Sequence, residues 1–189
     1  MSGFFMKRFE VSTEIGSLFV TYQKQKKVLV CLSGAGLLPS YENFSLILEK
    51  LPPTIGYLTI DFPNTGRSPI RDQAGKNLDN LADAVYKVLE ELAISEYILC
   101  AHSLSGILAC KLLNKPIKCQ ALVALEPTTK KVMFADFSEN PYPEMEEQMR
   151  LIEEFGPELY FKNLTQSTFN PETNKEIWKL MQEKGLELE

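Results

Sequence analysis

The sequence predicts an α/β fold with a mostly parallel β-sheet. The apolar runs at residues 28–33, 97–101 and 121–125 are short and continuous, which is typical of strands buried on both faces. The segment between the first two runs includes residues 77–92, where apolar side chains recur every three or four positions and indicate a helix. Strands that alternate with helices are typical of a parallel sheet covered by helices.

The other elements follow from local patterns. A β-prone stretch, a turn at residues 14–16 and a second β-prone stretch predict an opening hairpin. Asn77 is a plausible N-cap for the helix that follows it, and Pro52-Pro53 ends an earlier helical segment. The further predicted elements are strands at 7–12, 17–23 and 55–60 and helices at 40–51 and 106–113.

After Glu126 the composition of the chain changes. Pro, Phe, Tyr and Met become frequent, and no further buried strand follows. Met145, Met149 and Ile152 recur at helical spacing, and Asn170 followed by Pro171 predicts the start of another helix, which Gly185 could end. We therefore expect a sheet-containing part at residues 1–127 and a helical part at residues 128–189.

The overall composition excludes several classes of protein. A chain of 189 residues with 44% hydrophobic and 24% charged residues suits a globular domain with a sizeable core. The net charge of −5, with no basic run longer than residues 24–27, argues against nucleic-acid binding. No segment is long and apolar enough to span a membrane, and the N-terminal residues lack the apolar region of a signal peptide. We therefore expect a cytoplasmic protein.

The cysteines do not indicate a metal or redox site. None of the four forms a CxxC pair, and the single histidine is not near paired cysteines, so we expect neither a metal nor another cofactor. Cys31 and Cys100 fall within predicted strands and are interpreted as buried free thiols.

The segment YILCAHSLSG joins a predicted strand directly to a predicted helix. Ser103 stands in it with small residues two positions before and after, Ala101 and Ser105. A serine on a sharp strand-to-helix turn needs small neighbours at these positions, because larger side chains would collide with the strand and the helix. Ser105 itself is excluded as the central serine, since Ile107 would then occupy a crowded position. The pattern by itself also fits a serine at an ordinary strand-to-helix junction, and it is the context of the neighbouring segments that favours a nucleophilic Ser103.

Two further segments with distinctive residues each follow directly after a predicted strand. The glycine-rich loop at residues 33–36 follows the first buried strand, and DFPNTGRS at residues 61–68 follows the next one. Together with the serine turn and ALVALEP at residues 121–127, they resemble the α/β-hydrolase family. The resemblance implies an α/β-hydrolase-type sheet, a helical cap at residues 128–189, and a serine hydrolase that acts on a small-molecule ester or related acyl substrate.

The resemblance also implies roles for individual residues. Ser103 would be the nucleophile, and the backbone N–H groups of Ala35 and Leu104 would form the oxyanion hole. Asp61 and Ser68 would stabilise a turn rather than take part in catalysis. Glu126 follows the strand next to the serine turn, where certain haloalkane dehalogenases carry the catalytic acid, so it is a candidate for the acid of a triad.

One departure from the family concerns the catalytic base. The family's histidine follows an eighth strand and its acid commonly follows a seventh, whereas this sequence ends in the predicted cap, as if truncated. The only histidine is His102, whose side chain should face away from the Ser103 hydroxyl because consecutive strand residues point to opposite faces. We therefore expect this chain alone to be inactive, and the strand at 121–125 to be an exposed sheet edge that promotes self-association.

Two alternatives remain open at this point. The first is a non-catalytic binding protein, or a relic of an enzyme, on the same fold. The second is a dinucleotide-binding domain, since Gly34-Ala35-Gly36 follows one strand and Asp61 ends the next. The second alternative is the weaker one, because the third glycine of that motif is missing and the serine turn is left unexplained.

Overall fold

The computed structural model describes residues 5–34, 38–69 and 77–128, several positions between 147 and 156, and residues 171–183. The chain divides into two compact units, Met1–Thr129 and Lys130–Glu189. In the second unit, helix α7 (Pro171–Glu183) begins at the predicted proline. Four residues of the predicted helices lie outside the described residues: Met145, Met149, Ile152 and the predicted helix end at Gly185. The assignment of residues 128–189 as a cap therefore stays a prediction.

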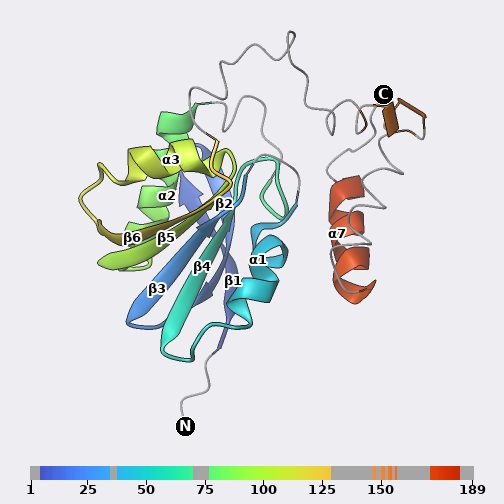
Figure 1. Ribbon diagram of the computed structural model, residues 1–189. Helices are drawn as coiled ribbons and strands as arrows, with labels where there is room; N and C mark the ends of the chain where they lie inside the picture. The colour runs from blue at the N-terminus through green and yellow to red at the C-terminus, as the bar shows by residue number, and fades with distance from the viewer. Residues whose placement is uncertain are drawn as a thin grey trace. The chain divides into compact units, whose positions relative to one another are not determined.

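The first unit contains a six-stranded sheet in the order β1-β2-β4-β3-β5-β6 (Figure 1). The strands β1 and β2 pair antiparallel as the predicted hairpin, and β2 pairs antiparallel with β4, whereas the pairs β3–β4, β3–β5 and β5–β6 are parallel. The expected α/β fold is thereby confirmed, with a mixed sheet whose parallel strands carry the predicted motifs. The strands are β1 (Lys7–Thr13), β2 (Gly16–Gln23), β3 (Lys27–Leu32), β4 (Ile55–Asp61), β5 (Glu96–His102) and β6 (Lys118–Leu125).

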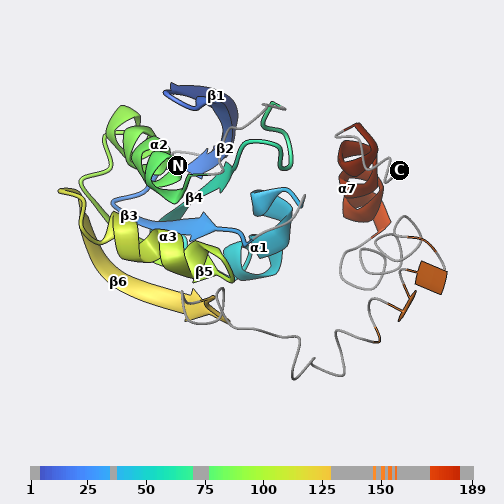
Figure 2. The ribbon, with the colours of Figure 1, turned by 90° about the horizontal axis from the view of Figure 1, so that it is seen from above.

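Three helices cover the sheet: α1 (Ser40–Leu48) on one face, and α2 (Leu78–Glu91) and α3 (Ser105–Leu112) on the other (Figure 2). The predicted N-cap of α2 is confirmed, since the Asn77 side chain accepts a hydrogen bond from the backbone N–H of Asp79. Helix α1 ends three residues earlier than predicted, because the backbone N–H groups of Lys50 and Leu51 close tighter turns onto Ile47 and Leu48.

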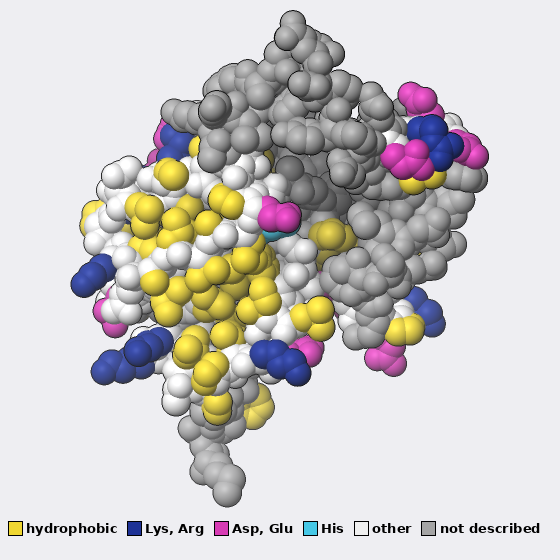
Figure 3. All heavy atoms as spheres, viewed as in Figure 1, with side chains coloured by type: hydrophobic (Ala, Val, Ile, Leu, Met, Phe, Trp, Pro, Cys, Tyr) yellow, Lys and Arg dark blue, Asp and Glu magenta, His cyan; other side chains and the backbone are white. Residues whose placement is uncertain are grey.

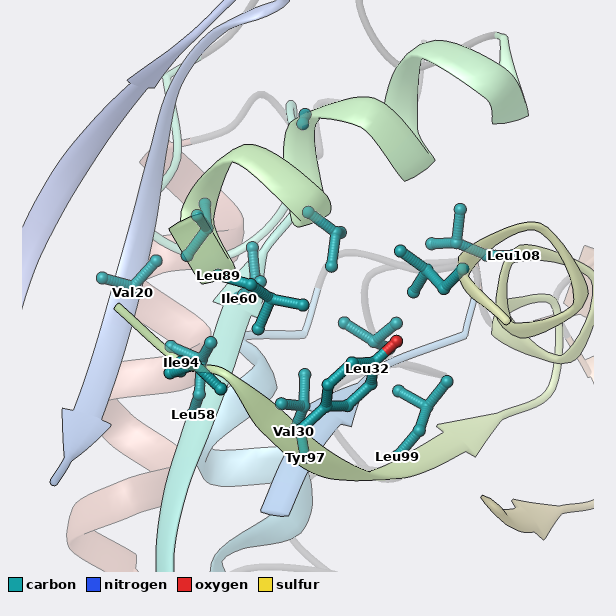
Figure 4. Close-up of a cluster of buried hydrophobic side chains, with 14 of the residues drawn as sticks. Val20, Val30, Leu32, Leu58, Ile60, Leu89, Ile94, Tyr97, Leu99 and Leu108 are labelled. Carbon is teal, nitrogen blue, oxygen red and sulfur yellow. The ribbon is translucent and has the colours of Figure 1, made fainter. Parts of the chain in front are cut away.

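The larger apolar core lies between the sheet and the pair α2–α3. Three adjacent strands, β4, β3 and β5, each contribute a fully buried leucine to this core: Leu58, Leu32 and Leu99 (Figure 4). The apolar face of α2 packs onto them through residues such as Val85 and Leu89. This closely packed layer holds the parallel strands in place, and the candidate site lies at their carboxyl ends.

The turn that follows β4 is held by Asp61 and Ser68. The Asp61 carboxylate accepts hydrogen bonds from the backbone N–H groups of Ser40, at 2.6 Å, and Arg67, at 2.9 Å. The Ser68 hydroxyl donates to the Asp61 carbonyl at 2.6 Å. Burial raises the pKa of Asp61, while the two N–H donors oppose that rise. The predicted turn-stabilising role of these residues is confirmed.

A glycine and an asparagine let the same turn close. Asn64 and Gly66 have φ angles of 67° and 47°, in the left-handed region where these residue types are favoured. A Cβ atom on Gly66 would also lie 2.3 Å from Oδ2 of Asp61. The turn therefore depends on glycine for both its backbone angle and the space beside the buried carboxylate.

Two further expectations concern the whole chain. Cys31 and Cys100 are buried free thiols, as predicted. Among the described residues, no helix is long and apolar enough to cross a membrane.

Candidate active site

Ser103 lies on a sharp turn between β5 and α3. Its φ angle is 52°, in a region that non-glycine residues rarely adopt. The turn is held from both sides: the Ser103 N–H donates to the carbonyl of Leu125 at 3.0 Å, and the Ser103 carbonyl accepts from the N–H groups of Gly106 and Thr128, each at 2.9 Å. The strained backbone expected of a nucleophilic serine at a strand end is therefore present.

The small residues on either side of the turn are both buried. Ala101 is fully buried, and Ser105 is 3% exposed. The Ser105 hydroxyl donates a hydrogen bond to the backbone carbonyl of Ser33, in the loop after β3. The sequence indicated only that Ser105 is small. In the structure, its hydroxyl also ties the loop to the turn, which glycine at this position could not do.

Gly34 packs directly against Ser103. A Cβ atom at Gly34 would lie 2.6 Å from Cβ and 3.1 Å from Oγ of Ser103. Gly106 is restricted in a similar way, because a Cβ atom there would lie 2.7 Å from Cβ of Pro127. The two glycines thus let the loop after β3 and the chain after β6 approach the turn closely.

The contact between Ser105 and Ser33 leads to a stability prediction. Ser105→Ala should lower the free energy of unfolding by about 1–3 kcal/mol, because the buried Ser33 carbonyl loses its donor. Chemical denaturation of the two chains would measure the difference. The matched control is Ser12→Ala, on the exposed side of β1, which should change stability by less than about 0.5 kcal/mol. Equal stability of Ser105→Ala and the unmodified chain would contradict a stabilising role.

One of the two predicted oxyanion donors can be located. Leu104 follows Ser103 and is the N-cap residue of α3, so its amide lies at the positive end of the helix. Within the described part of the chain, neither the Leu104 N–H nor the Ser103 Oγ forms a hydrogen bond. Ala35 lies outside the described residues. Its predicted role remains a prediction.

Glu126 and His102 lie near the turn in the sequence, and neither side chain is hydrogen-bonded to the Ser103 hydroxyl. Glu126 directly follows β6, the parallel neighbour of β5, and its side chain is exposed, with a φ angle of 43°. His102 precedes Ser103, and its Nδ1 atom is buried without a hydrogen-bond partner. Among the described residues, no hydrogen bond joins either side chain to Ser103. The predicted acid role of Glu126 thus stays a prediction.

A small cavity of about 30 Å³ lies between the loop after β3 and the starts of helices α2 and α3. That volume suits about one water molecule and is too small for an ester substrate. The cavity is lined by Ser33, Gly34, Phe62, Leu78, Leu81, Leu104, Ser105 and Leu108.

This arrangement of strands, loop and serine turn agrees with a comparison of the sequence with protein families. Residues 27–183 match the family described as alpha/beta hydrolase fold. The chain belongs to the α/β-hydrolase fold family. The predicted family resemblance is thereby confirmed, and the dinucleotide-binding alternative is set aside.

Individual members of this family are similar to the chain to different extents. The crystal structure of Smu.1393c from Streptococcus mutans superposes with a TM-score of 0.85 and 31% identity, over 97% of this chain and 69% of that one. A protein of Mycoplasma genitalium named "Putative esterase/lipase 2" is 30% identical over 112 residues, or 56% of this chain. The chain spans 39% of that relative's length.

A structure with much lower sequence identity supports the shared fold and nothing more specific. The epoxide hydrolase VrEH1 from Vigna radiata has a TM-score of 0.68 at 13% identity, over 96% of this chain and 68% of that one.

Proposed function

We propose that this α/β-hydrolase is a serine hydrolase that acts on an ester or a related acyl compound, with Ser103 as the nucleophile. The observation that carries the proposal is the left-handed backbone of Ser103 at the β5–α3 turn, with Gly34 packed against it. The similarity to a protein named as an esterase/lipase supports the choice of an acyl substrate.

The proposed reaction follows from the groups around Ser103. Its Oγ attacks the acyl carbonyl and gives its proton to a base, while the carbonyl oxygen becomes negatively charged. The N–H groups of Leu104 and Ala35 stabilise that charge. The alcohol then leaves with a proton, and water releases the acid from the acyl-serine by the reverse sequence of proton transfers.

The mechanism needs a base, and His102 does not act as that base. Its Nδ1 atom is buried and unpartnered, and it forms no hydrogen bond with Ser103. Glu126 would orient a base placed beside Ser103, because it follows the strand adjacent to β5 at the same end of the sheet. A non-catalytic binding protein on the same fold is the second candidate. The observation that favours it is that no basic side chain is hydrogen-bonded to Ser103 among the residues that the structure describes.

We also propose a cytoplasmic location for the protein. The two buried thiols of Cys31 and Cys100 are unpaired by a disulfide, which suits a reducing compartment.

A serine-directed fluorophosphonate distinguishes the two candidate functions, with imidazole added to the solution as an external base. We expect slow labelling of the unmodified chain that imidazole accelerates, and no labelling of Ser103→Ala. Ser12→Ala, which alters an exposed serine on β1, should label like the unmodified chain. Equal labelling of Ser103→Ala would refute Ser103 as the nucleophile. An unmodified chain that stays unlabelled in imidazole would favour the binding protein.

A further inference from the structure

The first turn of helix α1 is bonded to two segments that are distant from it in the sequence. Ser40 and Asn43 are three positions apart and lie on the same face of the helix. The Ser40 N–H donates to the Asp61 carboxylate, in the turn after β4, at 2.6 Å. Nδ2 of Asn43 donates to Oγ of Ser33, in the loop after β3, at 3.2 Å. The start of α1 therefore holds both segments in place.

The donors and acceptors around Ser33 fix the direction of each hydrogen bond. The N–H group of the Asn43 amide can only donate, and the backbone carbonyl of Ile60 can only accept. The Ser40 hydroxyl donates its single hydrogen to that carbonyl at 2.6 Å, so it accepts from the Ser33 hydroxyl at 3.1 Å. The bonds thus run from Asn43 through the two serines to Ile60. Both serines are buried, so solvent is poorly placed to replace a missing partner.

Apolar packing alone does not fix where α1 lies on the sheet. The helix packs through Phe44 and Leu48 against the sheet, and hydrophobic side chains gather over the region where Figure 1 places β5 and β6 (Figure 3). Apolar contacts are non-directional, so they tolerate small displacements of a helix along such a surface. Hydrogen bonds are directional, and those from the first turn of α1 remove this freedom.

Ser33 transmits this constraint to the serine turn. Its hydroxyl is bonded to Asn43, and its backbone carbonyl accepts from the Ser105 hydroxyl. The next residue is Gly34, which lies so close to Ser103 that an added Cβ atom would be 2.6 Å from the serine Cβ. A displacement of Ser33 would therefore carry Gly34 into the serine or away from it.

We propose that Asn43 is a positioning residue for Ser103 and that it acts through Ser33 and Gly34. The inference rests on the proposed function of Ser103 as a nucleophile. Without the amide donor, the Ser33 hydroxyl keeps only the bond that it donates to Ser40, and the loop shifts. The hydroxyl of Ser103 is then no longer aligned with the acyl carbonyl that it attacks. Asn43 itself touches neither the substrate nor the reacting atoms.

Fluorophosphonate labelling in imidazole, at several probe concentrations, tests the proposal on the full chain. Asn43→Leu keeps the branched shape of the side chain but cannot donate a hydrogen bond. We expect the maximal labelling rate to fall about tenfold, because a displacement of about 1 Å can cost up to about 10²-fold in rate. The half-saturating probe concentration should change by less than about twofold, since the probe-binding surface is intact. A hydrogen bond that only stabilises the fold would leave both quantities unchanged in the folded chain, and circular dichroism checks folding.

The matched control is Asn114→Leu, at the end of α3. Its amide also donates to a neighbouring oxygen, the carbonyl of Cys110, at 3.0 Å, but it is exposed and bonded within its own helix. This variant should label like the unmodified chain. Equal slowing of Asn114→Leu and Asn43→Leu would overturn the proposal.

A double-mutant cycle tests whether Asn43 acts through Ser33. Ser33→Ala should slow labelling at least as much as Asn43→Leu does. The double variant Ser33→Ala/Asn43→Leu should match Ser33→Ala within about twofold, because the two residues share one hydrogen bond. Effects that multiply would show that Asn43 acts independently of Ser33 and would overturn the proposal.

Two further outcomes separate this inference from the proposed function. If the unmodified chain is labelled at Ser103 and Asn43→Leu is labelled at the same rate, the positioning role is wrong and the nucleophile stands. If the unmodified chain stays unlabelled, the proposed function is wrong and the positioning role falls with it.

Discussion

We expect the 189-residue chain to accelerate the hydrolysis of p-nitrophenyl acetate by no more than about 10³-fold over the uncatalysed rate in water. A serine hydroxyl is a weak nucleophile near neutral pH and needs an adjacent base. The only histidine in the chain is His102, and it forms no hydrogen bond with Ser103. Loss of the base of a serine hydrolase lowers its rate by about 10⁶-fold, which leaves the contribution of the oxyanion hole and of binding.

Two variants decide whether this explanation is correct. His102→Gln and Ser103→Ala should each hydrolyse the ester at about the same low rate as the unmodified chain, because without a base the Ser103 hydroxyl attacks the ester too slowly to add measurably to that rate. The rates are measured by release of p-nitrophenol under identical conditions. Robust turnover by the unmodified chain that disappears in both variants would show that His102 is the base.

Gly34→Ala is expected to disrupt the serine turn. The added Cβ atom would lie 2.6 Å from Cβ of Ser103, well inside van der Waals contact. Ser103 cannot move away freely, because its N–H and C=O groups are bonded to Leu125, Gly106 and Thr128. We expect a loss of about 1–3 kcal/mol in the free energy of unfolding from this overpacking. We also expect fluorophosphonate labelling in imidazole to slow by about 10²-fold, since a displacement of about 1 Å can cost that much in rate.

The control for this variant is Gly156→Ala, which adds the same methyl group in the second unit. A Cβ atom at Gly156 meets no atom within 4 Å, although the φ angle there is 78°. We expect a cost of about 1–2 kcal/mol from the backbone angle and unchanged labelling of Ser103. Stability and labelling are measured by denaturation and by the initial rate of probe incorporation. Labelling of Gly34→Ala at the rate of the unmodified chain would show that the turn tolerates the side chain.

The periodicity of apolar residues was sufficient to predict most elements of the first unit. Residues 97–101 were predicted as a strand and belong to β5 (Glu96–His102), and the helix predicted from 77 onward is α2 (Leu78–Glu91) with Asn77 as its cap. These features depend on side chains that are close in the sequence, and on whether they alternate or recur at helical spacing. The strained serine turn was predictable for the same reason, since its small neighbours lie within two residues of Ser103.

Other features depend on residues that only the tertiary structure brings together. Arg67 donates two hydrogen bonds to the buried carboxylate of Glu42, at 2.7 and 3.0 Å, and so joins the turn after β4 to α1, but nothing in the local sequence pairs these two residues. The bond from Ser105 to Ser33 spans 72 positions.

The sequence by itself thus determined the elements, the family and the identity of the central serine, because each follows from local patterns. The tertiary structure alone decided the strand order, the close approach of Gly34 to Ser103 and the pairing of Arg67 with Glu42. The physical reason is that contacts between distant segments are selected by the packing of the whole sheet, and local propensity does not encode that packing.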